Sequence, residues 1–293
     1  MKKLLYNAIN KLGYNIYKKN RKDIAIIKKL EKYNVSVHFN LLFRCSSYVF
    51  VLAEVFEDLE ISDAEEFIKI SFNNMVFYVE SGEEFIILNE IFIDNDYDFG
   101  INEECVLIDI GANVGMATIF FSKMDNIKKI YAFEPVKDNF DLAQRNFDAN
   151  QISNVDFYNF GLGKEERDEK FLYSRQLKGN SGLRGTNNPY YQNLINVEEK
   201  TVKIKRASEI LSPILEKSKE FKIVVKMDCE GAEYEIIENL SNENLLSKIN
   251  IIMLEWHDYG PERVEKVLKE SGFLIFSRPL GPISGMIYGV RAL

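Results

Sequence analysis

The chain has few cysteines and few histidines, and this restricts the covalent and metal chemistry that it can carry. Its three cysteines, Cys45, Cys105 and Cys229, are odd in number and far apart, so they predict neither a disulfide framework nor a zinc-ligand pair. This usage favours a reducing compartment. Because there are only two histidines, His38 and His257, a bound metal ion would take most of its ligands from carboxylates.

Long hydrophobic runs are also missing. The apolar stretches at residues 48–53 and 106–121 are too short, or too often interrupted by polar residues, to supply the roughly 20 apolar residues of a membrane-spanning helix. The first residues contain too few consecutive apolar side chains for a signal peptide. We therefore expect a cytoplasmic protein that neither spans a membrane nor is exported.

Positive charge is scarce outside the N-terminus. The whole chain has 37 basic and 45 acidic residues, a net charge of −8, yet residues 1–32 contain ten basic and two acidic residues, a balance of +8. The other 261 residues therefore carry −16, and such an acidic body argues against nucleic-acid binding. The basic segment also has an apolar stripe at helical spacing, at Leu5, Ile9, Leu12 and Ile16. It predicts either a helix docked on the body or a surface helix that contacts an acidic partner or the anionic inner face of a membrane.

The first hundred residues mix two hydrophobic periods. Residues 39–60 have a helical pattern, whereas residues 68–72 and 75–79 alternate around Asn73-Asn74, which predicts a β-hairpin. A short helix is expected over residues 83–93. We therefore divide the chain into a helical and β-hairpin region, residues 1–100, and a second domain, residues 101–293.

From residue 105 onward, strand and helix patterns alternate. The expected strands are residues 106–109, 129–133, 155–158, 223–227, 249–254, 273–276 and 286–290, and the expected helices are 116–123, 138–150, 233–240 and 261–271. Strands apolar on both faces with helices between them predict an α/β fold, a doubly wound parallel sheet with helices on both faces. The last two strands have only a short link and should form an antiparallel hairpin. Residues 174–200, rich in small polar residues, predict a long functional loop.

The first two strands of this domain end in residues suited to a nucleoside. Asp109 leads into a turn in which Gly111 permits a tight bend and Gly115 permits close packing or close cofactor approach. Glu134 follows 25 residues after Asp109, where a carboxylate can bind both ribose hydroxyls. Asn113 replaces the middle glycine of the dinucleotide motif, which disfavours NAD. A nicotinamide-dependent oxidoreductase nevertheless stays an alternative.

Several motifs together resemble the FkbM family of S-adenosylmethionine-dependent methyltransferases. They are Asp109-Ile110-Gly111-Ala112-Asn113-Val114-Gly115, Phe133-Glu134-Pro135, Lys226-Met227-Asp228-Cys229-Glu230-Gly231-Ala232-Glu233 and Leu254-Glu255-Trp256-His257. Shorter similarities lie at residues 91–99 and 145–150, and the resemblance covers roughly residues 65–275. The block from Asp228 to Glu233 is its most specific element.

The resemblance implies a Rossmann-like, seven-stranded methyltransferase sheet and methyl transfer to oxygen. The acceptor would be a hydroxyl of a sugar, a glycan or a secondary metabolite. The implied cofactor is S-adenosyl-L-methionine, bound by the turn residues Asp109, Gly111, Ala112, Asn113 and Gly115 together with Glu134. The third strand ends without an acidic residue, so backbone groups near Phe160 and Gly161 are the candidates for adenine. A catalytically inactive binding scaffold is a further alternative.

Three residues are the candidates for catalysis: Asp228, Glu255 and His257. Asp228 ends the fourth strand, and Glu255 and His257 end the fifth, where alternation places both on one side. A histidine with its usual pKa near 6.5 could remove a hydroxyl proton, with Asp228 orienting the acceptor or the histidine. Alternatively, the three residues could bind a divalent ion. Glu233 is expected to be a helix-start residue, and Lys226 to pair with an acidic neighbour.

Overall fold

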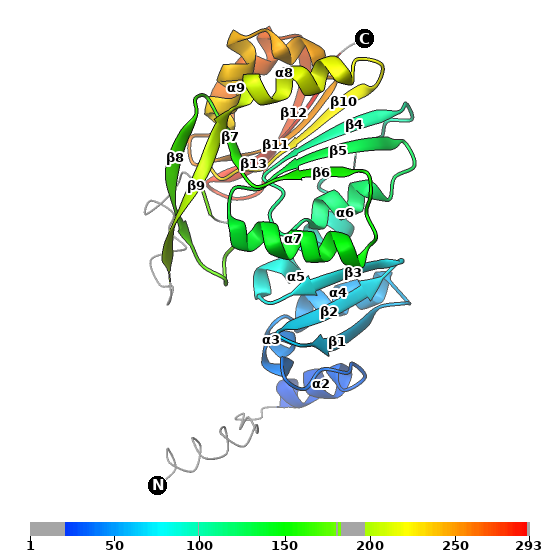
Figure 1. The fold of residues 1–293 in the computed structure, drawn as a ribbon. Helices are drawn as coiled ribbons and strands as arrows, with labels where there is room; N and C mark the ends of the chain where they lie inside the picture. Colours follow the sequence, from blue (N-terminus) through cyan, green and yellow to red (C-terminus); the bar gives the residue numbers. More distant parts are fainter. Residues whose placement is uncertain (1–20, 99, 180, 183–196, 292–293) are drawn as a thin grey trace.

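A seven-stranded sheet forms the centre of the protein, as the sequence predicted (Figure 1). The computed structural model describes residues 21–98, 100–179, 181–182 and 197–291. The strand order is β12-β13-β11-β10-β4-β5-β6, in which β13 runs antiparallel to both of its neighbours and the other described pairings are parallel. The strands are β4 (Cys105–Ile110), β5 (Ile127–Phe133), β6 (Val155–Tyr158), β10 (Lys222–Met227), β11 (Ile251–His257), β12 (Phe273–Pro279) and β13 (Ser284–Arg291).

Helices cover both faces of this sheet, so it is buried in the middle of the fold. On one face lie α6 (Met116–Ser122) and α7 (Lys137–Ala149), and on the other lie α8 (Ala207–Lys217) and α9 (Glu233–Asn242) (Figure 1). The 3₁₀ helix η3 (Leu245–Lys248) and α10 (Glu262–Glu270) join the core of the second face. Along β4, Val106, Ile108 and Ile110 enter that core. Leu107 enters the core under α6, and by alternation Asp109 points to this same face.

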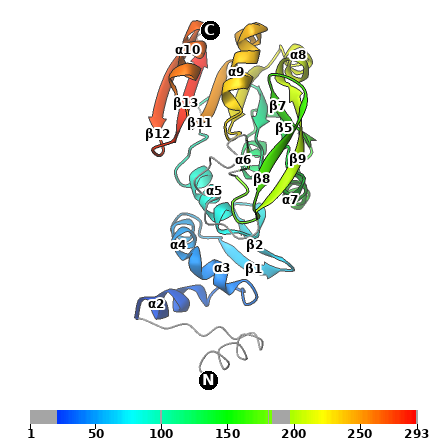
Figure 2. The same ribbon diagram turned by 90° about the vertical axis from the view of Figure 1, so that its left-hand side faces the viewer.

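The N-terminal region packs beyond α5 (Gly82–Phe92), on the side of the sheet that α6 and α7 cover (Figure 2). It contains α2 (Arg21–Leu30), α3 (Phe39–Arg44), α4 (Ser46–Val55) and an antiparallel sheet of β1 (Glu60–Ala64), β2 (Phe67–Phe72) and β3 (Met75–Val79). The hairpin of β2 and β3 confirms the prediction, whereas β1 was not foreseen. The basic and apolar stripe at residues 5–16 lies outside the described residues.

One hydrophobic core joins this region to the main sheet. It contains Leu88 and Ile91 of α5 together with Leu107 of β4 and Phe121 of α6. Two side-chain amides, from Asn146 of α7 and from Asn150 directly after it, also bond to β3: Asn146 accepts the N–H of Tyr78, and Asn150 accepts the N–H of Val76. The core therefore continues across residue 100, and the proposed division at this point stays a prediction.

A second, smaller sheet was missed by the sequence reasoning. It has the order β7-β9-β8, from β7 (Gly161–Gly163), β8 (Arg167–Tyr173) and β9 (Glu198–Arg206), and it leads into α8. The strands β8 and β9 are rich in Lys and Glu and bury few side chains, so hydrophobic alternation is weak, and β7 has only three residues. The expected loop is shortened, because residues 198–200 belong to β9. Residues 180 and 183–196 of it lie outside the described residues.

No helix among the described residues is both long enough and apolar enough to cross a lipid bilayer.

Candidate active site

The turn after β4 and the turn after β10 touch each other through their backbones. Gly111 has a left-handed φ of +82°, and a Cβ at this position would lie 1.8 Å from the carbonyl oxygen of Asp228. The N–H of Asp228 in turn donates to the carbonyl of Ile110 at 3.0 Å. Gly111 is therefore required both by its φ and by this close approach.

Asp109 does not reach the surface of this site. Its side chain is fully buried and accepts a 2.6 Å hydrogen bond from the Thr118 hydroxyl. Lys226 lies 3.2 Å from its other carboxylate oxygen and donates to the carbonyl of Gly111 at 2.6 Å. Lys226 therefore pairs with an acidic neighbour, as expected. Asp109, which the sequence suggested as a direct cofactor contact, instead supports the Gly111 turn from within the core.

Two further candidate residues also serve packing. Gly115 has a φ of +82°, and a Cβ there would lie 2.6 Å from the Phe147 ring of α7, so this glycine permits helix packing rather than cofactor approach. The Phe160 ring lies 5.6 Å from that of Phe133, and the Lys205 ammonium lies 4.7 Å from the Phe160 ring centre. Neither Gly115 nor Phe160 lines either of the two pockets described below.

Glu134 lies where a ribose-binding carboxylate was expected. It is only 4% exposed, and its two oxygens accept the backbone N–H groups of Asn113 at 2.9 Å and of Val136 at 2.8 Å. Burial raises the pKa of Glu134 to about 7, although these two hydrogen bonds oppose the shift. Each oxygen keeps a second lone pair that can accept a hydroxyl.

A pocket of about 570 Å³, including the space at its open mouth, adjoins Glu134. Besides Glu134 its walls include Gly111, Asn113, Pro135, Asn139, Gly161, Leu162, Phe171, Lys178, Ile204 and Asp228. The side-chain oxygens of Asn113 and Asn139 are buried without a hydrogen-bond partner. Buried acceptors beside a carboxylate and an apolar wall fit a ligand with hydroxyl donors and a flat apolar part, as in the nucleoside of S-adenosylmethionine.

Lys178 and Asn139 were missed by the sequence reasoning. Lys178, which comes from the expected functional loop, is almost fully buried and forms ion pairs with Glu84 and with Glu80, the latter at 2.9 Å. Gly179 donates its N–H to Glu83 at 2.9 Å. The described start of the loop is therefore fixed to α5, and no local pattern in the sequence indicated a partner about 90 residues away.

A second pocket, of about 390 Å³, shares Gly111, Asn113 and Asp228 with the first. Ala112 and Lys226 also line it, and α5 contributes Glu90. Burial raises the pKa of Glu90 to about 8, and the negative charges of Glu255 and Asp228 add to the shift. Glu90 lay outside the motifs, so only the packing of α5 against the sheet reveals it.

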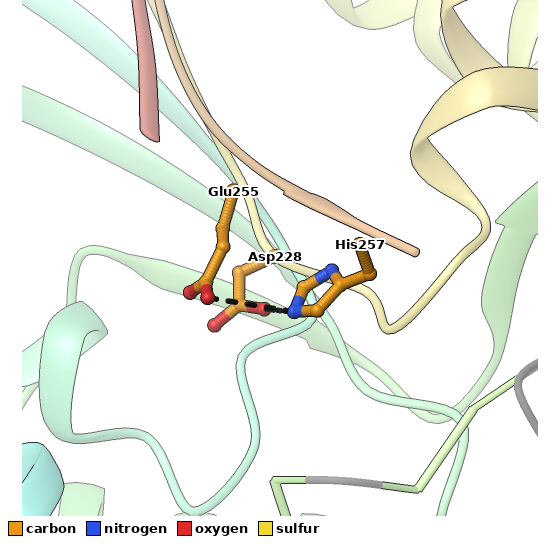
Figure 3. Close-up of side chains that lie close together, drawn as sticks. All are labelled: Asp228, Glu255 and His257. Atoms are coloured by element: carbon orange, nitrogen blue, oxygen red, sulfur yellow. Dashed lines mark ion pairs between the residues drawn. The ribbon is translucent and has the colours of Figure 1, made fainter. Parts of the chain in front are cut away.

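The three catalytic candidates lie together at the ends of β10 and β11 (Figure 3). Each offers a ligand atom, and these atoms all lie within 4.8 Å of one another. Nε2 of His257 is 3.5 Å from Glu255 Oε1 and 4.0 Å from Asp228 Oδ1. The alternation that predicted Glu255 and His257 on one side is thus reproduced.

The surroundings of His257 differ from those of a free histidine. Its Nδ1 lies 2.5 Å from Glu233 Oε1, and its Nε2 lies 3.5 Å from Glu230 Oε1. Burial opposes the charge, but Glu233 and Glu230 raise the pKa of His257 well above its usual value. The expectation of a pKa near 6.5 is therefore wrong. Glu233 is the first residue of α9, as predicted, and it also holds the imidazole.

Known methyltransferases are similar to this chain. "Methyltransferase 1" of Beauveria bassiana is 29% identical over 204 residues, which cover 64% of this chain and 80% of the relative. The hexuronic acid methyltransferase AglP of Haloferax volcanii is 27% identical over 170 residues, 58% of this chain and 63% of the relative. A crystal structure of an FkbM methyltransferase from Methylobacillus flagellatus covers 92% of this chain and 59% of its own, with 12% identity and a TM-score of 0.43.

The methyltransferase FkbM domain matches residues 109–275, which is more than half of the chain and includes every candidate site residue. This match decides between the methyltransferase and the nicotinamide-dependent oxidoreductase. The residues around Glu134, with their unpartnered acceptors, fit the expected cofactor. The chain therefore belongs to the FkbM family of S-adenosylmethionine-dependent methyltransferases.

Proposed function

We propose that this methyltransferase acts on a hydroxyl oxygen of a sugar, a glycan or a small metabolite. One observation carries the proposal: Asp228 lines both pockets, so a carboxylate lies at their junction, with Glu255 and His257 beside it. A carboxylate at such a point can orient a hydroxyl and take up its proton.

The first pocket suits the nucleoside of the cofactor. Glu134 would bind the ribose hydroxyls, and the buried oxygens of Asn113 and Asn139 would accept further donors. The wall formed by Pro135, Gly161, Leu162 and Ile204 suits adenine. When bound, S-adenosylmethionine supplies an electrophilic methyl group that a hydroxyl oxygen can attack.

The side chains of the three residues at the strand ends differ in their exposure to solvent. The side chain of Asp228 is 30% exposed, that of Glu255 is 19% and that of His257 is 4%. We therefore assign contact with the acceptor to Asp228, which orients the hydroxyl and receives its proton as the new carbon–oxygen bond forms. Glu255 and His257 set the charge around it.

The charge of the site favours an uncharged acceptor group. Asp228 lines both pockets, Glu230 lines the first, and Glu255 lies 3.5 Å from the same imidazole as Glu230, so a free carboxylate on the acceptor would be repelled there. The Haloferax volcanii relative is named for a hexuronic acid, so its name supports a sugar acceptor but, because that sugar carries a carboxyl group, not an uncharged one. We accordingly expect a sugar hydroxyl or a comparable neutral hydroxyl of a metabolite.

The test is transfer of a labelled methyl group from S-adenosylmethionine to a panel of neutral hexose glycans, hexuronic acid glycans and hydroxylated metabolites. Asp228→Asn should lower turnover on the true acceptor by about 10²–10⁴-fold and leave the affinity for S-adenosylhomocysteine nearly unchanged. Glu238→Ala, which removes an exposed carboxylate of α9, is the matched control and should behave as the unmodified protein. Methyl transfer to nitrogen or carbon only, or full turnover by Asp228→Asn, would refute the assignment. Cofactor binding with no transfer to any class would instead favour the inactive scaffold.

A further inference from the structure

Four carboxylates converge on one imidazole at the ends of β10 and β11. Glu230 and Glu255 each place an oxygen 3.5 Å from Nε2 of His257, and Asp228 places one at 4.0 Å. These separations exceed the roughly 2.7–2.9 Å of a charge-assisted hydrogen bond. The oxygens thus surround the nitrogen without bonding tightly to it.

The imidazole is held so that one nitrogen faces this group. Its Nδ1 is bound by Glu233, whose side chain is fully buried and also accepts the N–H of Gly231 at 2.6 Å. The His257 side chain itself is 96% buried, since it is 4% exposed. Nε2 therefore points at the carboxylates of Asp228 and Glu255 (Figure 3). A carboxylate on the far nitrogen of a histidine is the usual support of a metal ligand.

In the described part of the chain, two basic side chains of the neighbouring strands have partners other than Asp228 and Glu255. Lys226 on β10 pairs with Asp109 and the Gly111 carbonyl. Arg278 on β12 pairs with Asp96. Asp228 and Glu255 thus lie beside an imidazole whose Nδ1 is already bound by Glu233, an arrangement that a bound cation would stabilise.

The geometry points to a divalent cation site formed by Asp228 Oδ, Glu255 Oε and His257 Nε2, with release to solvent of the proton that Nε2 otherwise carries. Ligands at 2.0–2.2 Å from a common ion lie roughly 3–4.4 Å apart, and the three atoms here lie within 4.8 Å of one another. One imidazole with two carboxylates suits a first-row ion such as Mn²⁺ better than Ca²⁺, which prefers oxygen alone.

Glu233 is the positioning residue of this site, and Asp228 places the ion beside both pockets. An ion at this point would leave open positions for an oxygen of the acceptor, because the protein supplies three ligands. It would also relieve the repulsion among the carboxylates. Binding of the ion can be measured without an acceptor, so the test of this site does not require the acceptor to be known.

The experiment titrates the purified full-length protein, stripped of metal, with Mn²⁺ and follows the electron paramagnetic resonance of free Mn²⁺. We expect one ion per chain and a rise in the melting temperature on binding. Asp228→Ala and Glu255→Ala should each weaken Mn²⁺ binding at least about ten-fold, and Glu233→Gln by about 10–100-fold. Glu238→Ala is the matched control and should bind as the unmodified protein. A near-native far-UV circular dichroism spectrum shows that each variant is folded.

Two results would overturn the inference: no stoichiometric Mn²⁺ binding, or equal binding by the unmodified protein and by folded Asp228→Ala and Glu255→Ala. The outcome is separable from that of the proposed function. Mn²⁺ bound at these residues without methyl transfer to any hydroxyl would refute the proposed function and support the site. Methyl transfer at full rate with no Mn²⁺ bound would do the reverse.

Discussion

Replacing Lys226 by methionine tests the structural role of the buried pair beneath the Gly111 turn. The Lys226 side chain is 4% exposed and that of Asp109 is not exposed at all, so neither charge is screened by water. Lys226→Met keeps the volume of the side chain but leaves Asp109 with only the Thr118 hydroxyl as a partner. It also removes the 2.6 Å hydrogen bond to the Gly111 carbonyl.

Breaking a buried ion pair by removing one partner typically costs about 3–5 kcal/mol. For a protein of this size each kcal/mol corresponds to roughly 2–4 °C, so we expect the melting temperature to fall by roughly 6–20 °C. Thermal unfolding followed by circular dichroism at neutral pH measures this. Lys222→Met, at the start of the same strand and only partly buried, is the matched control and should change stability by less than about 0.5 kcal/mol.

The double variant Asp109→Leu/Lys226→Met distinguishes stability lost with the ion pair from stability lost through altered packing. With both charges removed, most of the lost stability should return, because no buried charge is left without a partner. A loss below about 1 kcal/mol in Lys226→Met, or a double variant as unstable as the sum of the two single variants, would contradict this account of Asp109.

Three further predictions concern other parts of the molecule. Because the pKa of Glu134 is raised to about 7 and the ionised form accepts hydroxyls, the affinity for S-adenosylhomocysteine should increase by about ten-fold from pH 6 to pH 8 in calorimetry, and Glu134→Gln should be weak and independent of pH. Gly115→Ala should cost about 1–3 kcal/mol in urea unfolding, since its Cβ would meet Phe147, whereas Gly100→Ala meets nothing within 4 Å and should be near neutral. Although burial opposes it, hydrogen bonds from the backbone of residues 36–38 and from the His38 ring hold the pKa of Asp63 well below its usual range. Asp63→Ala should therefore cost about 1–3 kcal/mol at pH 7, and the difference should shrink as the pH falls below about 4; a constant difference would exclude this charge as its source.

The sequence could predict the main sheet because its signals are local. Each of β4, β5, β10 and β11 is a short, largely apolar run followed by a helical period, and Gly111 allows the tight turn after β4. The position of a residue within such a run also shows whether it lies at the amino or the carboxyl end of the strand. For this reason Glu134, Asp228, Glu255 and His257 could all be assigned to one edge of the sheet before their distances were known.

The small sheet of β7, β8 and β9 and the strand β1 escaped prediction for the opposite reason. Few side chains of β1 and β8 are buried: β8, for example, buries only two of its seven. A period of two is then too weak to detect in the sequence. Only their pairing with neighbouring strands defines them: β1 with β2, and both β7 and β8 with β9.

The sequence by itself determined the fold class, the family motifs and the edge of the sheet at which the site lies. Only the tertiary structure decided whether each side chain there faces the pockets or the core. It turned Asp109 into the core beside Lys226, brought Lys178 and Glu90 to the pockets from distant elements, and surrounded His257 with carboxylates. The physical reason is that a side chain's charge state and role depend on neighbours that are remote along the chain, whereas strand, turn and helix patterns depend on neighbours a few residues away.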